Sequence, residues 1–196
     1  MGIKLEAKHK TKTSKSGSLA LYCTYPPKRL VHLLAFALLL GSCGQQERPL
    51  EGLTTLILVR HAEKASDGTD DPPLNEVGKA RAELLKTTLA EADVAAIYST
   101  PYQRNTSTVA PLADALGLTI KEYDSKQPAA QFVAQLQAEH RGKQVLVCGH
   151  SNTIPAMLNA LTGTEQYPEL TESEYEYLFI VTLLEGGEAA VVRLRF

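Results

Sequence analysis

The sequence predicts an α/β fold, a three-layer α/β/α sandwich in which a mostly parallel central sheet ends in antiparallel strands. Four short β-prone runs alternate with segments of helical periodicity, the pattern of a parallel sheet covered by helices on both faces. The fourth run, residues 145–148, is apolar throughout, as expected of a strand buried in the middle of such a sheet. The last two apolar runs flank Glu-Gly-Gly-Glu and predict a terminal hairpin.

The first strand is predicted at residues 54–59, where a β-branched and apolar run stops at Arg60-His61. Residues 66–73 contain Ser, Asp, Gly and Thr before two prolines, a composition typical of a loop. Asn75 is a suitable N-cap for the helix that follows. The apolar residues expected on the inner face of this helix recur at helical spacing: Val77, Ala80, Leu84, Leu85 and Leu89.

The second strand is predicted at residues 95–99. Pro101 suits the first turn of the next helix, because a helix start leaves that amide without a partner in any case. Gly117 is expected to end this helix. Its inner face is expected to comprise Val109, Leu112, Ala113 and Leu116.

The remaining elements follow the same alternation. A weak third strand is expected at residues 119–123, and a helix at about 128–140 leads to the central strand at 145–148, which stops at Gly149-His150. Residues 177–184 and 190–196 are expected to form the hairpin. Another helix is expected to follow His150. The inner face of the helix at 128–140 is expected to present Phe132, Val133 and Leu136, and that of the helix after His150 to present Ile154, Met157, Leu158 and Leu161.

Residues 28–43 resemble a bacterial secretory signal, because two basic residues precede an apolar run at 30–40 and small residues follow it. The run is too short to span a bilayer comfortably, since a span needs roughly 20 apolar residues. Cys43 directly after the run predicts a lipobox, in which this cysteine becomes the lipidated N-terminus; an ordinary cleaved signal and an uncleaved anchor are the alternatives. We therefore divide the chain into a signal and lipobox region (1–43), a tether (44–52) and a globular domain (53–196).

These assignments predict an exported protein, held at the bacterial cell envelope by a lipid anchor on Cys43, on the periplasmic side or the cell surface. From Cys43 onward the chain has 13 Lys and Arg against 21 Asp and Glu, a net charge of −8. Such an acidic body argues against nucleic acid as a partner and requires a local basic cluster for any anionic substrate. Cys148 is the one other cysteine in this part, so we expect it to be a free, buried strand residue.

Two predicted strands stop at a histidine, the first at Arg60-His61 and the central one at Gly149-His150. Ligands gather at the carboxyl ends of strands in an open α/β sheet, so both histidines are expected to share one crevice. The second strand leads into Arg104, one turn into the following helix. The fork of donors on arginine matches phosphate oxygens, and imidazole can attack phosphorus. Each residue alone is more commonly a capping, packing or surface residue, but their convergence favours phosphate chemistry.

The order of these motifs resembles the histidine phosphatase superfamily, in the branch with phosphoglycerate mutases, small bacterial phosphatases and phosphohistidine phosphatases. Arg60-His61 is similar to the signature pair, with Ala62 where glycine is common. Three further segments are similar to later motifs: residues 74–80, 98–108 and 149–152. The resemblance covers residues 54–196, is weakest in the hairpin, and implies a phosphoglycerate mutase-like fold.

The resemblance implies that His61 attacks phosphorus and becomes a phosphohistidine. Arg60, Arg104 and His150 would hold the phosphate oxygens and offset their charge in the transition state. The helix start at Ser151-Asn152 would add free backbone N–H groups to the phosphate site. Neither a metal nor a cofactor is implied, because the arginines supply the positive charge.

A proton donor for the leaving group is not assigned. Many relatives carry a glutamate downstream of the second arginine, but the corresponding region here, residues 122–128, lacks the usual arginine–glutamate context. Asp124 or Glu63 could serve as general acid, and each is equally an ordinary loop charge or helix cap. Relatives that act on phosphohistidine manage without a carboxylic acid, because their leaving imidazole is easily expelled.

The sequence therefore predicts a phosphatase that hydrolyses a small phosphomonoester or phosphohistidine through an intermediate on His61. A non-catalytic phosphate-binding module on the same fold is one alternative. A phosphoglycerate-type mutase is another, disfavoured by the export signal and the unassigned acid. No large insertion follows the second strand, so we expect an open, permissive site. The substrate and the oligomeric state are not set by the sequence.

Overall fold

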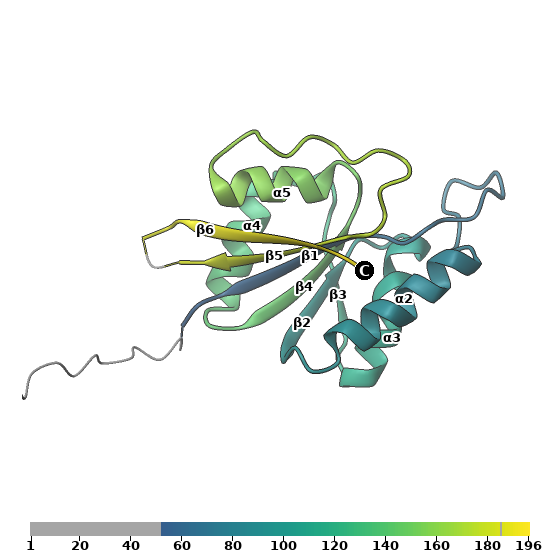
Figure 1. The fold of residues 1–196 in the computed structure, drawn as a ribbon, viewed down its shortest axis with the longest axis horizontal. Helices are drawn as coiled ribbons and strands as arrows, with labels where there is room; N and C mark the ends of the chain where they lie inside the picture. Colours follow the sequence, from purple (N-terminus) through teal and green to yellow (C-terminus); the bar gives the residue numbers. More distant parts are fainter. Residues whose placement is uncertain (1–51, 185) are drawn as a thin grey trace, which may run out of the picture. The chain divides into compact units, whose positions relative to one another are not determined.

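The computed structural model describes residues 52–184 and 186–196; the predicted signal, the lipobox with Cys43 and nearly all of the tether lie outside this part. The described residues form one sheet with strand order β3-β2-β4-β1-β5-β6 and four helices (Figure 1). The strands are β1 (Thr55–Arg60), β2 (Val94–Ser99), β3 (Ile120–Glu122), β4 (Gln144–Gly149), β5 (Tyr177–Leu183) and β6 (Ala189–Arg195). The helices are α2 (Glu76–Leu89), α3 (Gln103–Leu116), α4 (Ala129–Glu139) and α5 (Thr153–Thr162).

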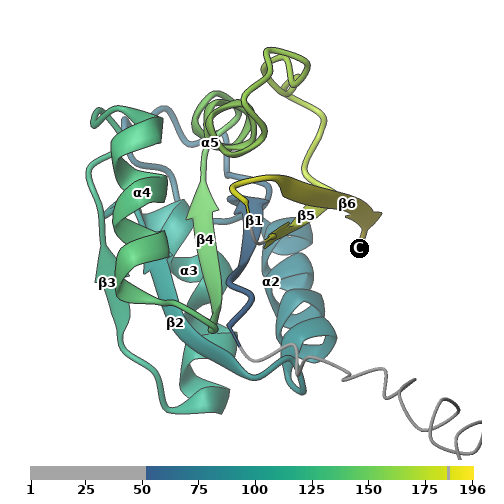
Figure 2. The ribbon, with the colours of Figure 1, turned by 90° about the vertical axis from the view of Figure 1, so that its left-hand side faces the viewer.

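The predicted mixed sheet is confirmed. β4 lies at the centre and pairs in parallel with β1 and β2, and β2 pairs in parallel with β3. β5 runs antiparallel to β1, and β6 antiparallel to β5, as expected of a terminal hairpin. Four strands therefore end at the same edge of the sheet, and the N-terminus of α5 lies at the carboxyl end of β4 (Figure 2).

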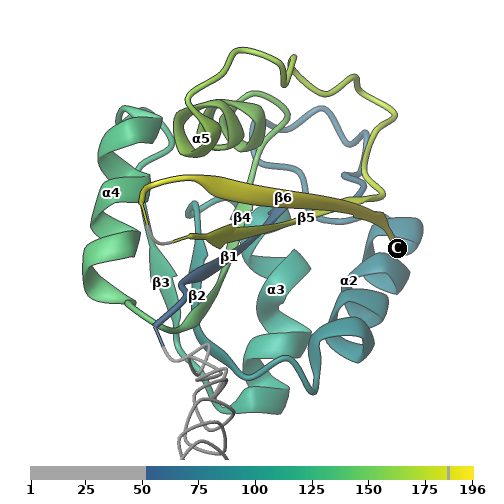
Figure 3. The same ribbon diagram turned by 60° about the vertical axis from the view of Figure 1, so that its left-hand side comes forward.

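Side chains alternate along β1 and build two apolar layers. Leu56 and Leu58 pack with α4 and α5 on one face, whereas Ile57 and Val59 pack with α2 and α3 on the other. Figure 3 shows these two helix pairs on either side of the sheet. Each fully buried aliphatic side chain contributes about 1.5–3 kcal/mol relative to an exposed one, so the two layers fix the strand ends on which the polar residues lie.

The inner face of α2 differs from the prediction. Val77 and Leu84 are 58% and 46% exposed, and Ala80 is exposed as well. Leu85 and Leu89 are buried as predicted, but the first half of the helix presents the small Gly78 and Ala82 inward. Gly78 lies so close to the chain after β1 that a Cβ there would be 2.2 Å from the carbonyl oxygen of Glu63. The buried positions are Gly78, Ala82, Leu85 and Leu89.

The ends of α2 and α3 follow the sequence signals with one exception. Asn75 caps α2 by accepting a hydrogen bond from the amide of Gly78 (2.9 Å), and Gly117 ends α3 with a φ of 65°. Pro101, however, lies outside α3. The carboxylate of Asp71 accepts a hydrogen bond from the amide of Gln103 (3.0 Å) instead, so a loop distant in sequence caps this helix.

Within residues 52–184 and 186–196, no helix combines the length and the apolar character needed to cross a membrane.

Candidate active site

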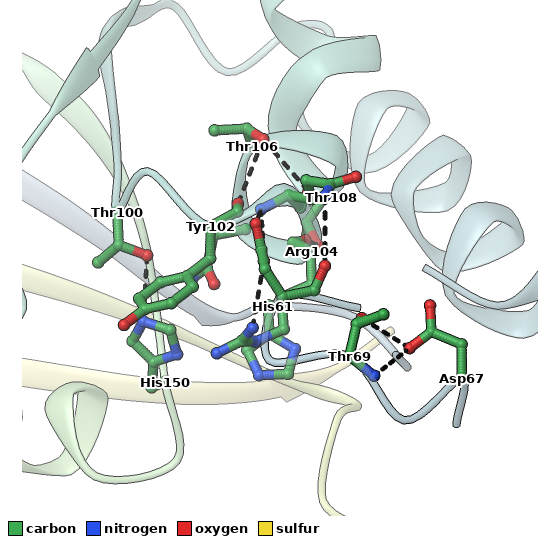
Figure 4. Close-up of polar contacts among 12 residues, drawn as sticks. His61, Asp67, Thr69, Thr100, Tyr102, Arg104, Thr106, Thr108 and His150 are labelled. Carbon is green, nitrogen blue, oxygen red and sulfur yellow. Dashed lines mark hydrogen bonds and ion pairs between the residues drawn. The ribbon is translucent and has the colours of Figure 1, made fainter. Parts of the chain in front are cut away.

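The carboxyl ends of β1 and β4 bring the two motif histidines together. Arg60 is paired in register with Gly149, and the amide of His61 donates to the carbonyl oxygen of Gly149 (2.9 Å). The residues that follow the two strands are therefore neighbours, and the ring centroids of His61 and His150 are 5.6 Å apart (Figure 4). The two strand ends therefore lie side by side, as predicted, and bring the two histidines together.

His61 is held as a neutral imidazole. Its ring is buried, and Nδ1 lies 2.8 Å from the carbonyl oxygen of Ala62. A carbonyl oxygen can only accept, so Nδ1 donates and Nε2 keeps its lone pair. The pKa of His61 is lowered to about 3, chiefly by burial and further by the charges of Arg60 and Arg104, while the hydrogen bond to Ala62 opposes the shift. At pH 7 this side chain can therefore act as a nucleophile.

His150 is oriented from β2. Its Nε2 lies 3.0 Å from the hydroxyl oxygen of Thr100, and the ring of Tyr102 packs edge-on against the imidazole, with centroids 5.3 Å apart (Figure 4). Burial, with the charge of Arg104 next, lowers the pKa of His150 to about 4. When Thr100 donates to Nε2, Nδ1 carries the hydrogen and can donate to an anion beside His61.

Arg104 lies in the first turn of α3. Its Cζ is 4.4 Å from the centroid of the Tyr102 ring, and its Nη1 is 3.4 Å from a carboxylate oxygen of Asp71. The segment is tied to the first motif, because the amide of Ala62 donates to the hydroxyl of Thr108 (2.9 Å), which in turn donates to the carbonyl oxygen of Arg104 (2.6 Å). These bonds fix the distance between the first histidine motif and the second arginine motif.

Arg60 is held by a turn from the far end of the chain. Its Nη1 donates to the carbonyl oxygens of Thr171 (2.6 Å) and Glu174 (3.2 Å), and its Cζ lies 4.1 Å from the ring centroid of Tyr175. Nη2 is 3.7 Å from the carboxylate of Glu172. One side of the guanidinium is thus committed to the turn, and the other side is left for a ligand.

The structure brings all six predicted phosphate-site residues into one pocket of about 440 Å³. They are Arg60, His61, Arg104, His150, Ser151 and Asn152. The Nε atoms of both arginines are buried without a hydrogen-bond partner among the described residues. Both arginines line the same pocket, and their positive charges favour an anion there. The described residues contain no group of three or more His, Cys, Asp or Glu side chains that could hold a metal ion.

Glu63, one of the two proposed proton donors, lies outside this pocket. Its carboxylate accepts hydrogen bonds from Nη2 (2.7 Å) and Nε (3.0 Å) of Arg81, which also donates to the carbonyl oxygen of Phe196 (2.6 Å). Burial raises the pKa of Glu63, but the hydrogen bonds and charge of Arg81 outweigh this, and the pKa lies below its usual value. Glu63 is thus kept ionised and joins α2 to the first motif.

Asp124, the other proposed donor, also lies outside the main pocket but beside it. Its Oδ1 accepts a hydrogen bond from the amide of Lys126 (2.9 Å), and the side chain is exposed. It lines a neighbouring cavity of about 400 Å³ that shares Tyr102, Ser125 and Lys126 with the main pocket. Of the two carboxyl groups, only this one lines a cavity that adjoins the main pocket.

Several residues in or beside the pocket were not predicted from the sequence. Thr100 and Tyr102 lie within the second arginine motif, and their proximity to Arg104 is a signal that could have singled them out. Glu169 and Glu172 line the pocket from the segment between α5 and β5. That segment carries no motif and lies more than a hundred residues from Arg60 in the chain, so no local pattern reveals it.

Comparison with known proteins relates part of the chain to one superfamily. A model described as the histidine phosphatase superfamily (branch 1) matches residues 56–125, which include Arg60, His61 and Arg104. The findings support the histidine phosphatase superfamily. The match ends at residue 125, before the second histidine motif. The inclusion of His150 in the site therefore rests on the geometry described above.

Phosphoserine phosphatase 1 of Hydrogenobacter thermophilus is 37% identical over 78 residues, which are 37% of this chain and 37% of that protein. The chain thus spans little more than a third of the length of this relative. Among solved structures, the protein histidine phosphatase SixA complexed with tungstate has a TM-score of 0.59 at 21% identity and covers 72% of this chain and 96% of its own.

Two further structures share the fold. YhfR of Bacillus stearothermophilus has a TM-score of 0.59 at 19% identity, covering 71% of this chain and 95% of its own. A mycobacterial glucosyl-3-phosphoglycerate phosphatase has a TM-score of 0.57 at 14% identity, covering 74% and 98%. At identities this low, the structural similarity establishes the fold alone. It confirms the fold that was expected from the sequence.

Proposed function

We propose that this chain is a phosphatase that hydrolyses a phosphomonoester or phosphohistidine through a phosphohistidine intermediate on His61. One observation carries the proposal: the buried His61 ring is fixed with Nδ1 against the carbonyl oxygen of Ala62, in the same pocket as two guanidinium groups and His150. A neutral imidazole with a free Nε2 is a nucleophile, and the guanidinium groups supply the positive charge that a phosphoryl group requires.

In the first step, Nε2 of His61 forms a bond to phosphorus, and the bond from phosphorus to the leaving oxygen or nitrogen breaks. The leaving atom takes the electron pair and a proton. Arg60, Arg104 and the Nδ1–H of His150 offset the charge on the phosphoryl oxygens. In the second step, water attacks phosphorus, the P–N bond breaks, and inorganic phosphate leaves with His61 neutral again.

The leaving group determines whether a proton donor is needed. For phosphohistidine the departing imidazole is a good leaving group, so no carboxylic acid is required. For esters of ordinary alcohols we propose Asp124 as the donor, because it borders the main pocket through Tyr102 and Ser125. Asp124→Asn is then expected to slow hydrolysis of phenyl phosphate by about a hundredfold while leaving p-nitrophenyl phosphate nearly unaffected.

The names of two relatives support the range of substrates in this proposal. One of them is a phosphoserine phosphatase and another a protein histidine phosphatase. The proposed partner of this chain is accordingly a small phosphorylated molecule or a phosphohistidine group. For its location we propose export and lipid anchoring through Cys43, which rests on the sequence of residues 28–43. Labelling of growing bacteria with a palmitate analogue should mark the chain, and Cys43→Ser should abolish the label.

The test of the activity uses the full chain with p-nitrophenyl phosphate and a phosphohistidine peptide. His61→Ala should abolish phosphate release and the radiolabel trapped on the protein after acid-free quenching. His140→Ala is the matched control, because His140 is the one other histidine among the described residues and bonds to the hydroxyl of Tyr98 outside the pocket. Binding of phosphate without its release from a substrate and without radiolabel on the protein would instead support a non-catalytic module. Transfer of the phosphoryl group between positions of phosphoglycerate would support a mutase.

A further inference from the structure

The mouth of the phosphate pocket carries charges that the proposed chemistry does not use. Beyond the two arginines and two histidines, the pocket is lined by Lys64 and Lys126 and by two carboxylates, Glu169 and Glu172. Lys64 follows β1, Lys126 precedes α4, and both glutamates come from the segment between α5 and β5. The rim therefore carries both positive and negative side chains, whereas the floor of the pocket carries the two positive arginines.

The acidic part of the rim is held in place by backbone contacts. The amide of Leu170 donates to the carbonyl oxygen of Ser151 (3.0 Å), which ties the segment to the start of α5. One residue on, the amide of Thr171 donates to the side chain of Glu174 (2.7 Å), whose own amide donates back to the carbonyl oxygen of Thr171 (3.1 Å). Glu172 therefore lies within a hydrogen-bonded turn, and Glu169 directly precedes the residue that ties this segment to α5.

The same turn is joined directly to the phosphate site through Arg60. Arg60 is 3% exposed, its Nη1 bonds to the turn, and the residue also lines the pocket. The positive charge of this guanidinium favours an anion in the pocket. Glu172 lies 3.7 Å from Nη2 of this guanidinium and lines the same pocket, so its carboxylate is close to an anion that Arg60 would bind.

The rim charges are available to a ligand. In the described part of the chain, Lys64, Lys126 and Glu169 have no ion pair within 4.0 Å, and the side chain of Glu172 is 80% exposed despite its contact with Arg60. A carboxylate this close to a phosphate site repels a second anionic group on that side and attracts a cation. The lysines have the opposite preference.

We propose that the pocket selects a phosphomonoester whose alcohol part carries an ammonium group and a carboxylate, that is, an O-phosphorylated amino acid. Glu169 and Glu172 bind the ammonium group, and Lys64 and Lys126 bind the carboxylate, while the phosphate lies on the arginines and histidines. The inference rests on the proposed phosphatase function and adds four specificity residues to it. None of the four takes part in the bond-breaking steps.

A pair of nearly isosteric substrates tests the ammonium site. O-Phosphoserine and 3-phosphoglycerate differ in an ammonium group against a hydroxyl, so the ratio of their kcat/KM values measures recognition of that charge. We expect a preference for phosphoserine of about tenfold, the size of one charge-assisted hydrogen bond. In a Glu169→Gln/Glu172→Gln double variant the ratio should fall towards one, whereas Glu91→Gln, an exposed carboxylate just beyond α2, should keep the wild-type ratio.

The carboxylate site is tested with phosphoethanolamine, which keeps the ammonium group and lacks the carboxylate. A Lys64→Met/Lys126→Met double variant should lose about tenfold in kcat/KM for phosphoserine and little for phosphoethanolamine. Equal losses for the two substrates would overturn the assignment of the lysines.

Binding measured by calorimetry separates this inference from the activity on which it rests. The phosphonate 2-amino-4-phosphonobutanoate should bind more tightly than 4-phosphonobutanoate, which lacks the ammonium group, and the difference should vanish in the glutamate double variant. Selective binding without turnover of any phosphate ester would refute the phosphatase and leave the subsite standing. Turnover with trapped phosphohistidine but equal binding of the two phosphonates would refute the subsite alone.

Discussion

Acidification from pH 7 to pH 5 is expected to destabilise the folded chain through His61. In the unfolded chain the imidazole has a pKa near 6.5 and takes up a proton in this range. In the folded chain burial, together with the charges of Arg60 and Arg104, lowers the pKa to about 3, so the ring stays neutral. The unfolded state therefore binds more protons between these two values, and the free energy of unfolding must fall as the pH falls.

The magnitude follows from the width of the window that acidification crosses. One pH unit is worth about 1.36 kcal/mol for a group that is protonated only in the unfolded state. From 6.5 down to pH 5 this gives about 2 kcal/mol for His61. His150, whose pKa is lowered to about 4, adds a smaller amount, because its ring is partly exposed and solvent screens the effect. A loss of about 2 kcal/mol or more is a large part of the stability of an ordinary domain.

The assay is urea unfolding at pH 7 and pH 5, followed by circular dichroism, for the wild-type chain and for His61→Asn, which cannot be protonated. The variant should lose about 2 kcal/mol less than the wild type on acidification. Nuclear magnetic resonance of the His61 Cε1–H group should show no titration between pH 8 and pH 5. An equal acid-induced loss in both proteins, or a His61 resonance that titrates near pH 6.5, would refute the reasoning.

Three further variants test the supports of the site. Gly78→Ala should cost about 3 kcal/mol of unfolding free energy in urea, because the new Cβ would meet the backbone oxygen of Glu63, whereas the exposed neighbour Lys79→Ala should change it by less than about 0.5 kcal/mol. Glu63→Gln should change kcat by less than about threefold with phenyl phosphate, because a true general acid contributes at least about a hundredfold. Thr100→Val should lower kcat/KM by about tenfold, since His150 loses the hydroxyl that sets its tautomer, and Thr100→Ser should retain activity.

Each of these expectations has an opposite outcome. Normal stability of Gly78→Ala would mean that α2 can move away from the first motif without cost. A hundredfold loss in Glu63→Gln, confined to substrates with poor leaving groups, would restore Glu63 as the proton donor. Equal kinetics of Thr100→Val and wild type would show that His150 is oriented by its other contacts, such as the ring of Tyr102.

The strand ends of this fold could be predicted because they depend on local patterns. Apolar runs that stop at Arg60-His61 and Gly149-His150 identify two buried strands, and parallel strands end at one edge of a sheet. The caps at Asn75 and Gly117 are equally local, since each depends on one side chain or one backbone angle. The inner face of α2 could not be read this way, because the small Gly78 marks a close backbone approach that apolar periodicity ignores.

The sequence by itself thus determined the order of the strands and helices and the residues that meet at the base of the pocket. Only the tertiary structure decided what surrounds them. Arg60 is positioned by the turn at Thr171 and Glu174, more than a hundred residues away, and Glu63 is bound to Arg81 rather than directed into the pocket. Contacts of this kind join elements through space, and no periodicity or spacing along the chain encodes them. The charged side chains around the phosphate site are likewise brought together only by the tertiary structure.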